Sequence, residues 1–413
     1  MLFRSVFDGI NNPENEEIRY YYPTNDLVTG PDIIFFWIAR MIMAGYEWRN
    51  ERPFRNVYFT GIVRDKLGRK MSKQLGNSPD PLDLIAKYGA DGVRVALLLC
   101  TSAGNDLMFD ESLCEQGRNF CNKIWNAYRL VTGWEVDNTL SQSDHCAKAV
   151  EWFENIYQKA YKEIEEHFEA YRISDAMMTL YRLFWDDFSG WYLEMIKPAY
   201  GSPADGATVE ATKLFFERLV KLLHPFMPFV TEELWQHISE RTDGQSVMLS
   251  LMEEHKPYDE KLLAEVDLAR EVVSAIRNIR AQRNIPNKEK VALEVIADEN
   301  YHSAYNCLVE KMAGLSTITE VSEKNPTAAA FIVKTTQYFV PMSENINVEE
   351  ELAKMEKELA YFEGFLKTVL GKLSNERFVN GAPAAVVENE RNKQRDAEAK
   401  IAALKERIAA LKK

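Results

Sequence analysis

Apolar residues recur with a different spacing in each of four successive parts of this 413-residue chain. Short apolar runs broken by glycine and proline fill residues 1–79, and spacings of three and four continue to about residue 283. Alternation follows up to residue 341, after which spacings of three and four return. A chain of this length is too long for a single hydrophobic core, so we expect several domains. Because spacings of three and four dominate, we expect a mainly α fold.

The first part predicts a small α/β unit. Ile18–Tyr22 is rich in aromatic residues and predicts a strand that ends at the following proline. Gly30-Pro31 predicts the start of a helix that stops near Gly45, and this helix is apolar on nearly every face, so we expect it to be buried. Val57–Thr60 is a predicted buried strand. Strand, helix, strand and loop is the order of nucleotide-binding α/β sheets, whose ligands lie beyond the carboxyl ends of the strands.

Residues 80–283 show no strand signal and predict a helical bundle. Pro81 opens the first helix and Gly89 ends it. Ser174-Asp175 and Thr231 are predicted N-caps, and residues 138–145 form a polar linker. The later helices are predicted over Ala90–Cys100, Phe120–Thr132, Trp152–Tyr171, Ala176–Tyr192, Leu214–Leu223, Glu232–Ser239 and Leu262–Arg283.

Two more patterns complete the chain. Alternation over Val291–Ile296, a helical period over Tyr301–Ala313, and strand-like runs at Ile318–Val321 and Phe331–Val333 predict a small α/β unit. Beyond residue 348, two long apolar repeats of three and four are separated by the Gly371–Pro383 connection. This pattern predicts two long helices in an antiparallel coiled-coil hairpin.

Composition narrows the function classes. A net charge of −13 argues against indiscriminate nucleic-acid binding. It does not exclude a nucleic acid that binds to local basic patches. No apolar stretch is long enough to span a membrane, and the five cysteines form no C-x-x-C pair. We therefore expect a cytoplasmic protein without disulfides, structural zinc or another metal site, in which His224, beside Pro225, is a structural turn residue.

The charge distribution points to one loop and one helix. Residues 64–73 hold five cations and one anion, and residues 389–413 hold eight cations and four anions. In the first segment, Lys70-Met71-Ser72-Lys73 lies between glycines, and flexible ammonium groups with exposed backbone N–H groups suit a multiply charged phosphate. A solvated turn is the alternative interpretation of a lysine-rich loop.

Several blocks in order carry a family resemblance. They are Tyr22-Pro23-Thr24, Leu27 to Met41 with Asp32-Ile33-Ile34-Phe35-Phe36-Trp37, Thr60 to Asp65, Lys70 to Ser78, Leu223 to Phe229 with Thr231 to Trp235, and Leu373-Ser374-Asn375 to Phe378-Val379 with Ala382-Pro383. With them the chain resembles the C-terminal half of the valyl-tRNA synthetases, a family of class I aminoacyl-tRNA synthetases. Gln74 stands where the family commonly has serine, and no His-Ile-Gly-His-type motif or editing domain is present.

The resemblance implies a domain order. Residues 1–79 would be the C-terminal part of a Rossmann-like catalytic domain with a Lys-Met-Ser-Lys loop, and 80–118 a helical stem-contact connector. An anticodon-binding bundle at 119–285, a small α/β subdomain at 286–347 and a tRNA-binding coiled-coil arm at 348–413 would follow.

It also implies an activity, the ATP- and Mg²⁺-dependent ligation of valine to its tRNA through valyl-adenylate. Because half of the ATP site is absent from this sequence, we expect no adenylate formation by these residues alone, and the N-terminal half of the enzyme is an implied partner. We expect a monomer.

The resemblance assigns roles residue by residue. Lys73 is the main pyrophosphate-contacting cation, Lys70 assists, and Ser72 shapes the loop or donates to phosphate. Asp32 accepts from a ribose hydroxyl or is only a helix N-terminal anion. Gly30 permits close ligand approach or is a turn glycine, while Gly61 and Ile62 offer backbone groups to adenine or only end a strand. Trp37 lines the valine pocket or is core. Arg391, Lys393, Arg395 and Lys400 bind tRNA phosphates or are solvated coiled-coil charges.

Three other interpretations stay open. The chain could be a tRNA-binding module without catalysis, part of the related isoleucyl or leucyl enzymes, or a helical scaffold that carries a basic loop and binds no nucleic acid. The cysteines lack the terminal zinc-type spacing of many isoleucyl relatives, which favours valine.

Overall fold

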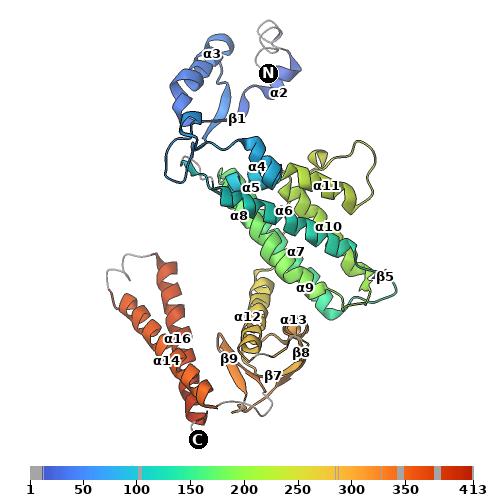
Figure 1. Cartoon of the computed structure of the whole chain (residues 1–413), viewed down its shortest axis with the longest axis vertical. Helices are drawn as coiled ribbons and strands as arrows, with labels where there is room; N and C mark the ends of the chain where they lie inside the picture. The colour runs from blue at the N-terminus through green and yellow to red at the C-terminus, as the bar shows by residue number, and fades with distance from the viewer. Residues whose placement is uncertain are drawn as a thin grey trace. The chain divides into compact units, whose positions relative to one another are not determined.

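The structure, a computed structural model, is mostly helical with small sheets (Figure 1). It describes residues 12, 14–100, 105–283, 285–286, 288–326, 328–341, 348–375 and 383–411; Phe378, Val379 and Ala382 of the arm motif and the cations Lys412 and Lys413 lie outside them. The chain divides into two compact units. The first contains residues up to 142, 153–193 and 197–258, and the second contains residues 143–152, 194–196 and 259 onward.

The first unit begins with a parallel pair of strands, β1 (Thr24–Thr29) and β2 (Phe54–Phe59). The predicted strand at Ile18–Tyr22 is wrong, because this segment belongs to helix α2 (Glu16–Tyr21). Asn15 caps α2 by accepting the N–H of Ile18, and two glutamates occupy its first turn, so capping overrides the β propensity of the tyrosines. The strand itself follows the proline.

Between the strands lie the 3₁₀ turn η1 (Pro31–Ile33), the π-helix η2 (Ile34–Ile38) and α3 (Ala39–Arg49). The predicted stop at Gly45 is wrong, since α3 ends at Arg49 and Asn50 adopts the left-handed conformation. Gly45 is needed within the helix because an added Cβ would lie 2.9 Å from both the Glu51 carbonyl and the Tyr22 hydroxyl. The predicted burial is also wrong, because most of the apolar side chains here are exposed.

The helical part of the chain before residue 250 keeps the predicted helices but shifts several ends. Asp110 caps α6 by accepting the N–H of Ser112, which starts the helix earlier than its apolar repeat. Neither predicted cap is one: α8 begins before Ser174, and the Thr231 hydroxyl lies within α11 and donates to the Met227 carbonyl at 2.6 Å. The helices are α4 (Pro81–Tyr88), α5 (Ala90–Cys100), α6 (Glu111–Thr132), α7 (Asp144–Glu169), α8 (Ile173–Arg182), π-helix η4 (Leu183–Tyr192), α9 (Leu193–Ile196), α10 (Gly206–Leu223) and α11 (Pro228–Ile238), followed by turn η5 (Val247–Leu249).

Short strands also occur where none were predicted. β3 (Val63–Arg64) pairs in parallel with β4 (Leu107–Met108), and β5 (Val136–Asp137) pairs in parallel with β6 (Ala204–Asp205). Pairs of two residues have no readable period, which is why the apolar pattern gave no signal for them. The predicted linker at 138–145 is shorter than expected, since α7 already begins at Asp144.

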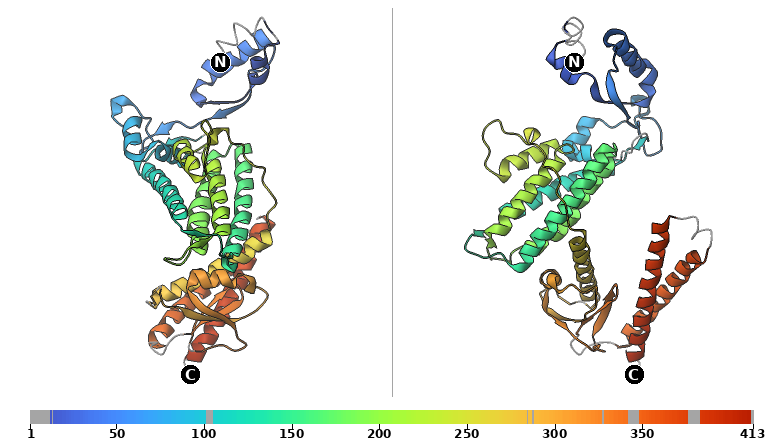
Figure 2. Two further views of the ribbon diagram at one scale, coloured as in Figure 1. Left: turned by 90° about the vertical axis from the view of Figure 1, so that its right-hand side faces the viewer. Right: turned by 180° about the vertical axis from the view of Figure 1, so that it is seen from behind.

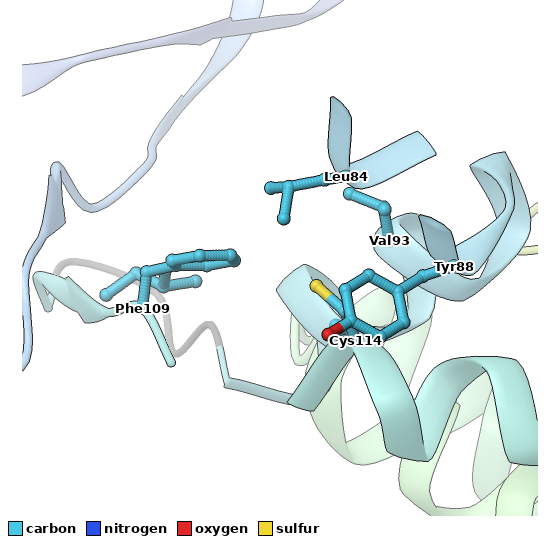
Figure 3. Close-up of a cluster of buried hydrophobic side chains, with 7 residues drawn as sticks. Leu84, Tyr88, Val93, Phe109 and Cys114 are labelled. Carbon is cyan, nitrogen blue, oxygen red and sulfur yellow. The ribbon is translucent and has the colours of Figure 1, made fainter. Parts of the chain in front are cut away.

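A buried cluster joins α4, α5, β4 and α6. It is formed by Leu84, Tyr88, Val93, Ala96, Leu107, Phe109 and Cys114, of which Figure 3 labels five. Helices α5 and α6 meet by backbone contact, because a Cβ on Gly117 would lie only 2.0 Å from the Gly92 carbonyl oxygen. This cluster supports the segment that directly follows the lysine loop.

Two side chains of α5, Asp91 and Arg94, fasten that helix to the first turn of α11 and to the turn before it, and we call them the α5 clamp. The Asp91 carboxylate accepts the N–H of Val230 at 2.7 Å and, more weakly, that of Phe229 at 3.4 Å. Arg94 donates to the carbonyls of the preceding turn, at residues 225 and 226, at 3.1 and 3.0 Å. Burial raises the pKa of Asp91 even though these amides oppose the shift. In the same turn, His224 Nδ1 lies 2.8 Å from the Thr231 hydroxyl, consistent with a structural residue.

The second unit contains α12 (Glu260–Gln282) and a four-stranded sheet in the order β8-β7-β10-β9, in which only the β7–β8 pair is parallel. Buried Arg280 donates to four backbone carbonyls and so ties α12 to the segments around the sheet. The sequence prediction missed β10, which follows a tight turn at Lys334. The other elements are β7 (Val291–Ile296), η6 (Ser303–Tyr305), α13 (Asn306–Ala313), β8 (Leu315–Glu320), β9 (Ala329–Val333) and β10 (Thr336–Val340).

Two long helices, α14 (Val348–Leu373) and α16 (Ala384–Leu411), end the described chain and lie side by side in Figures 1 and 2. Lys372 pairs with Glu390 near the connection between them, whereas Glu363 pairs with Lys405 farther away. Such pairing requires antiparallel helices. No helix in the described ranges is both long and apolar enough to cross a membrane.

Asp91→Ala removes the acceptor of the two α11 amides. We expect the free energy of unfolding to fall by about 1–2 kcal/mol, because two part-buried N–H groups lose their acceptor. Urea unfolding followed by tryptophan fluorescence measures the change. Asp243→Ala, on an exposed loop of the same unit, is the control and should change it by less than about 0.5 kcal/mol. Equal stability of Asp91→Ala and the wild type would contradict the clamp.

Candidate active site

The lysine loop, residues 64–78, leaves β3 and leads to α4. The Ser72 hydroxyl accepts the N–H of Leu75 at 3.2 Å and thereby caps a single 3₁₀ turn, η3 (Lys73–Leu75). Gly76 then adopts a left-handed conformation, with φ of 64°, which lets the chain reverse. Met71 packs against the buried cluster of α4, α5, β4 and α6, so the loop is anchored at the centre of the Lys-Met-Ser-Lys block.

The five cations of the loop are not equivalent. Arg64 pairs with Asp106, Lys66 lies 2.9 Å from Asp110, and Arg69 lies 2.7 Å from Asp65. The hydrogen bond from Lys66 lowers the pKa of Asp110 to about 2. Lys70 and Lys73 are exposed and have no carboxylate partner among the described residues. The two lysines that the sequence singled out are therefore the ones left to meet an anion.

Gly30 and Gly61 follow the ends of neighbouring strands. Thr29 at the end of β1 is in register with Phe59 at the end of β2, and the N–H of Thr60 donates to the Thr29 carbonyl at 2.9 Å. The structure thus brings two of the predicted ligand-facing segments to the carboxyl edge of one parallel sheet, where ligands of such sheets bind. Asp32 is exposed in the first turn of η1, and its carboxylate lies over Gly30.

The backbone around Gly61 is already occupied by the chain itself. A Cβ on Gly61 would lie 1.7 Å from the Asn105 carbonyl oxygen, so close packing alone requires glycine. The N–H of Ile62 donates to Asp106 at 3.1 Å, and its carbonyl accepts from Leu107 at 3.0 Å. In this arrangement Ile62 has no spare N–H for a base.

Trp37 is not core. It lies on η2 and is 61% exposed, and its neighbour Phe35 is 85% exposed. Large apolar side chains are likewise exposed along β1 and α3, and we call the whole set the apolar surface: Val28, Phe35, Phe36, Trp37, Met43, Tyr46 and Trp48. Several large exposed apolar side chains on adjoining elements favour a binding or interaction surface.

The predicted arm cations lie on α16, and carboxylates of the same helix already pair with three of them. Arg391 and Arg395 lie 3.7 and 3.0 Å from Glu388, and Lys393 lies 2.7 Å from Glu390. Lys400 instead lies over the Phe362 ring at 5.1 Å. The hydrogen bond from Lys393 helps to hold the pKa of Glu390 below its usual range. The positive charge of the helix is thus partly compensated within the arm.

Two further residues of the loop, Asp65 and Asn77, join its two ends through their side chains and were not predicted from the sequence. The signal for Asp65 was its position two residues before Leu67-Gly68. An aspartate in a turn often accepts backbone N–H groups a few residues ahead, here those of Leu67 and Arg69. The partnership with Asn77 had no sequence signal, because it spans twelve residues.

Comparisons with known proteins define the class. Residues 3–110 match the family "tRNA synthetases class I (I, L, M and V)", and residues 150–297 match the "anticodon-binding domain of tRNA ligase". Residues 347–412 match the "valyl tRNA synthetase tRNA binding arm". These matches follow one another in the order of a class I tRNA synthetase of the isoleucine, leucine, methionine and valine group.

Similar proteins narrow this further. The valine–tRNA ligase of Parabacteroides distasonis is 58% identical over 99% of this chain and 47% of its own length, and that of Phocaeicola vulgatus is 59% identical over 99% and 46%. That of Enterococcus faecalis is 37% identical over 98% and 47%. Among solved structures, an Agrobacterium radiobacter LeuRS–tRNA–LeuAMS complex has a TM-score of 0.43 at 22% identity, covering 58% of this chain and 30% of that one.

The chain belongs to the valyl-tRNA synthetase family and matches the C-terminal part of its members. It spans about half the length of the relatives that it matches.

Gly61→Ala should disturb the site through packing. The added Cβ meets a backbone carbonyl, so β3 must move away from β4, and we expect a loss of roughly 1–3 kcal/mol in the free energy of unfolding. Gly30→Ala is the matched variant, because its Cβ meets only the mobile end of the Asp32 side chain and should cost less than about 1 kcal/mol. Urea unfolding of both variants checks the difference. Equal losses would contradict this account of Gly61.

Proposed function

We propose that this chain supplies the C-terminal part of a valine–tRNA ligase: one side of the ATP site, the anticodon-binding bundle and the tRNA-binding arm. The observation that supports it best is the exposure of Lys70 and Lys73 in an ordered loop whose other cations are paired with carboxylates. Ordered cations without carboxylate partners suit the phosphates of ATP, and the family membership supplies the substrate class.

In this proposal the valine carboxylate attacks the α-phosphate of ATP, and pyrophosphate leaves as valyl-adenylate forms. Lys73, assisted by Lys70, neutralises the charge that develops on the leaving pyrophosphate, which is electrostatic and positional catalysis. Ser72 fixes the turn that carries Lys73. Mg²⁺ arrives with the ATP phosphates, and the described residues contain no cluster of three or more ligands that would hold it independently.

The strand ends contribute binding groups. Asp32 accepts from a ribose hydroxyl, Gly30 allows the nucleotide to approach the backbone, and the Gly61 segment borders the adenine. Ile62 does so by shape rather than through its N–H, which is committed to Asp106. Trp37 forms one wall of the valine pocket. It is exposed in this chain because another segment would complete the pocket.

The apolar surface then receives the N-terminal half of the synthetase, in the same or a second polypeptide. Parallel sheets are normally covered on both faces, and two strands alone are marginally stable. β1 and β2 pair only with each other in the described structure. A further α/β unit that adds strands to this sheet would bury Trp37 and its neighbours. The chain alone is then expected to be inactive.

The remaining parts take the roles that the family resemblance implies. Residues 1–79 form the Rossmann-like catalytic remnant, 80–118 the stem-contact connector, 119–285 the anticodon-binding bundle, 286–347 a small α/β subdomain, and 348–413 the coiled-coil arm. In the arm, Arg391, Lys393, Arg395 and Lys400 contact tRNA phosphates. The partners of the complete enzyme are the valine tRNA, valine and ATP.

Mixing this chain with the N-terminal half of the Parabacteroides distasonis relative should restore valine-dependent ATP–pyrophosphate exchange. The chain alone should show none, and Lys73→Ala should lower the exchange rate of the mixture by about a hundredfold or more, as expected when a charge that stabilises the transition state is lost. Gln74→Ala, in the same loop, should retain it. Exchange by the chain alone, or full exchange with Lys73→Ala, would refute the proposal.

The arm assignment is tested by binding of the valine tRNA to this chain in a filter assay. Replacing Arg391, Lys393, Arg395 and Lys400 with glutamine should weaken binding about tenfold or more, because phosphate contacts are lost. Replacing Lys357 and Lys367, exposed on α14, is the control for charge in general. An equal loss in the control would show that α16 has no special part.

A further inference from the structure

We propose that Asp65 and Asn77 are positioning residues that lock the two ends of the lysine loop together and so fix Lys70 and Lys73 for their phosphate ligand. This inference rests on the proposed function, since it concerns the same loop. Neither residue needs to touch the ligand.

The Asp65 carboxylate is the centre of the network. Its Oδ1 accepts the N–H of Leu67 at 3.0 Å and that of Arg69 at 2.9 Å. Its Oδ2 accepts from the Arg69 guanidinium at 2.8 Å and from the Asn77 side-chain amide at 2.9 Å. The residue is only 9% exposed, although it lies in a solvent-facing loop. One side chain therefore closes the turn before the lysines.

Asn77 closes the other end. Its Nδ2 donates to Asp65, while its Oδ1 accepts the N–H of Ser72 at 2.9 Å. The same amide group lies 3.4 Å from the Lys70 carbonyl. Asn77 thus contacts the backbone on both sides of Met71, whose side chain packs against the buried cluster. The segment from Lys70 to Ser72 is therefore held by the packing of Met71 and by the hydrogen bonds of Asn77.

The charge of Asp65 has a second effect. Asp65 lies among five cations whose mutual repulsion favours an open loop, and its carboxylate pairs with the Arg69 guanidinium. The hydrogen bond from Asn77, together with those from Arg69 and Leu67, holds the pKa of Asp65 well below its usual range. Because a depressed carboxyl pKa contributes stability at all pH values above the ordinary one, the network should persist through mildly acidic pH.

Preorganisation is the functional consequence. A flexible loop must lose conformational freedom when it binds phosphate, whereas this one has already lost it on folding. The lysine side chains stay mobile, but their backbone positions are set. Asp65 and Asn77 would therefore affect how tightly pyrophosphate binds without contributing a charge to it.

The test measures the binding of inorganic pyrophosphate by calorimetry to this chain mixed with the N-terminal half of the Parabacteroides distasonis relative, together with hydrogen exchange of the Leu67, Arg69 and Ser72 amides. Asn77→Asp is nearly isosteric but loses the amide donor and faces a like charge, so it should weaken pyrophosphate binding about tenfold and speed exchange of these amides. Asp65→Asn should act similarly. Gln74→Ala, exposed in the same loop, should change neither measurement.

The swapped variant, Asp65→Asn with Asn77→Asp, restores an amide–carboxylate pair and should recover part of both losses. Such recovery in a double-mutant cycle would not arise from simple misfolding. If wild type binds pyrophosphate and Asn77→Asp binds it equally well despite faster exchange, the positioning role is wrong and the proposed function stands. If wild type binds no better than Lys73→Ala, the phosphate assignment of the loop fails, and with it the proposed function.

Discussion

Two parallel strands cannot cover both faces of their own sheet, and this constraint governs the N-terminal segment of the molecule. β1 and β2 carry between them only η1, η2 and α3, so the apolar residues that a complete sheet would bury stay exposed. The same open edge is where Gly30 and Gly61 meet. In the proposed function, incomplete burial and the missing part of the ATP site would have one cause, and a single added α/β unit would remedy both.

The lysine loop is supported by the helices that follow it in the chain. Met71 packs on the cluster of α4, α5, β4 and α6, and the α5 clamp fixes α5 to the start of α11 and to the turn before it. The close approach of Gly92 and Gly117 keeps α5 and α6 in backbone contact. Through these steps the loop is built on the helical part of its unit rather than on the exposed sheet. It can therefore be ordered before the rest of a nucleotide site is assembled around it.

Local signals were correct at some positions and wrong at others, such as Gly45 and Thr231. Pro81 and Gly89 gave both ends of α4, and the repeats of three and four gave the helices of the arm. The sequence failed where the answer depends on contacts made elsewhere. Thr24–Thr29 has no apolar alternation, yet it forms β1 because β2 pairs with it. An apolar period indicates that Trp37 needs cover, but not whether this polypeptide provides it. Charge alone singled out Lys70 and Lys73 as a hypothesis. It did not predict that Arg64, Lys66 and Arg69 pair with carboxylates at residues 106, 110 and 65.

The ion pairs of α16 have a consequence for how an arm of this kind responds to salt. A lysine or arginine that already contacts Glu388 or Glu390 exchanges one anionic partner for another when it meets a phosphate. Fewer condensed counterions are then released into solution per contact than a count of cations suggests. The logarithm of the affinity should fall less steeply with the logarithm of salt concentration, and an arm with internal carboxylate partners would hold its nucleic acid over a wider range of ionic strength than a helix of uncompensated lysines.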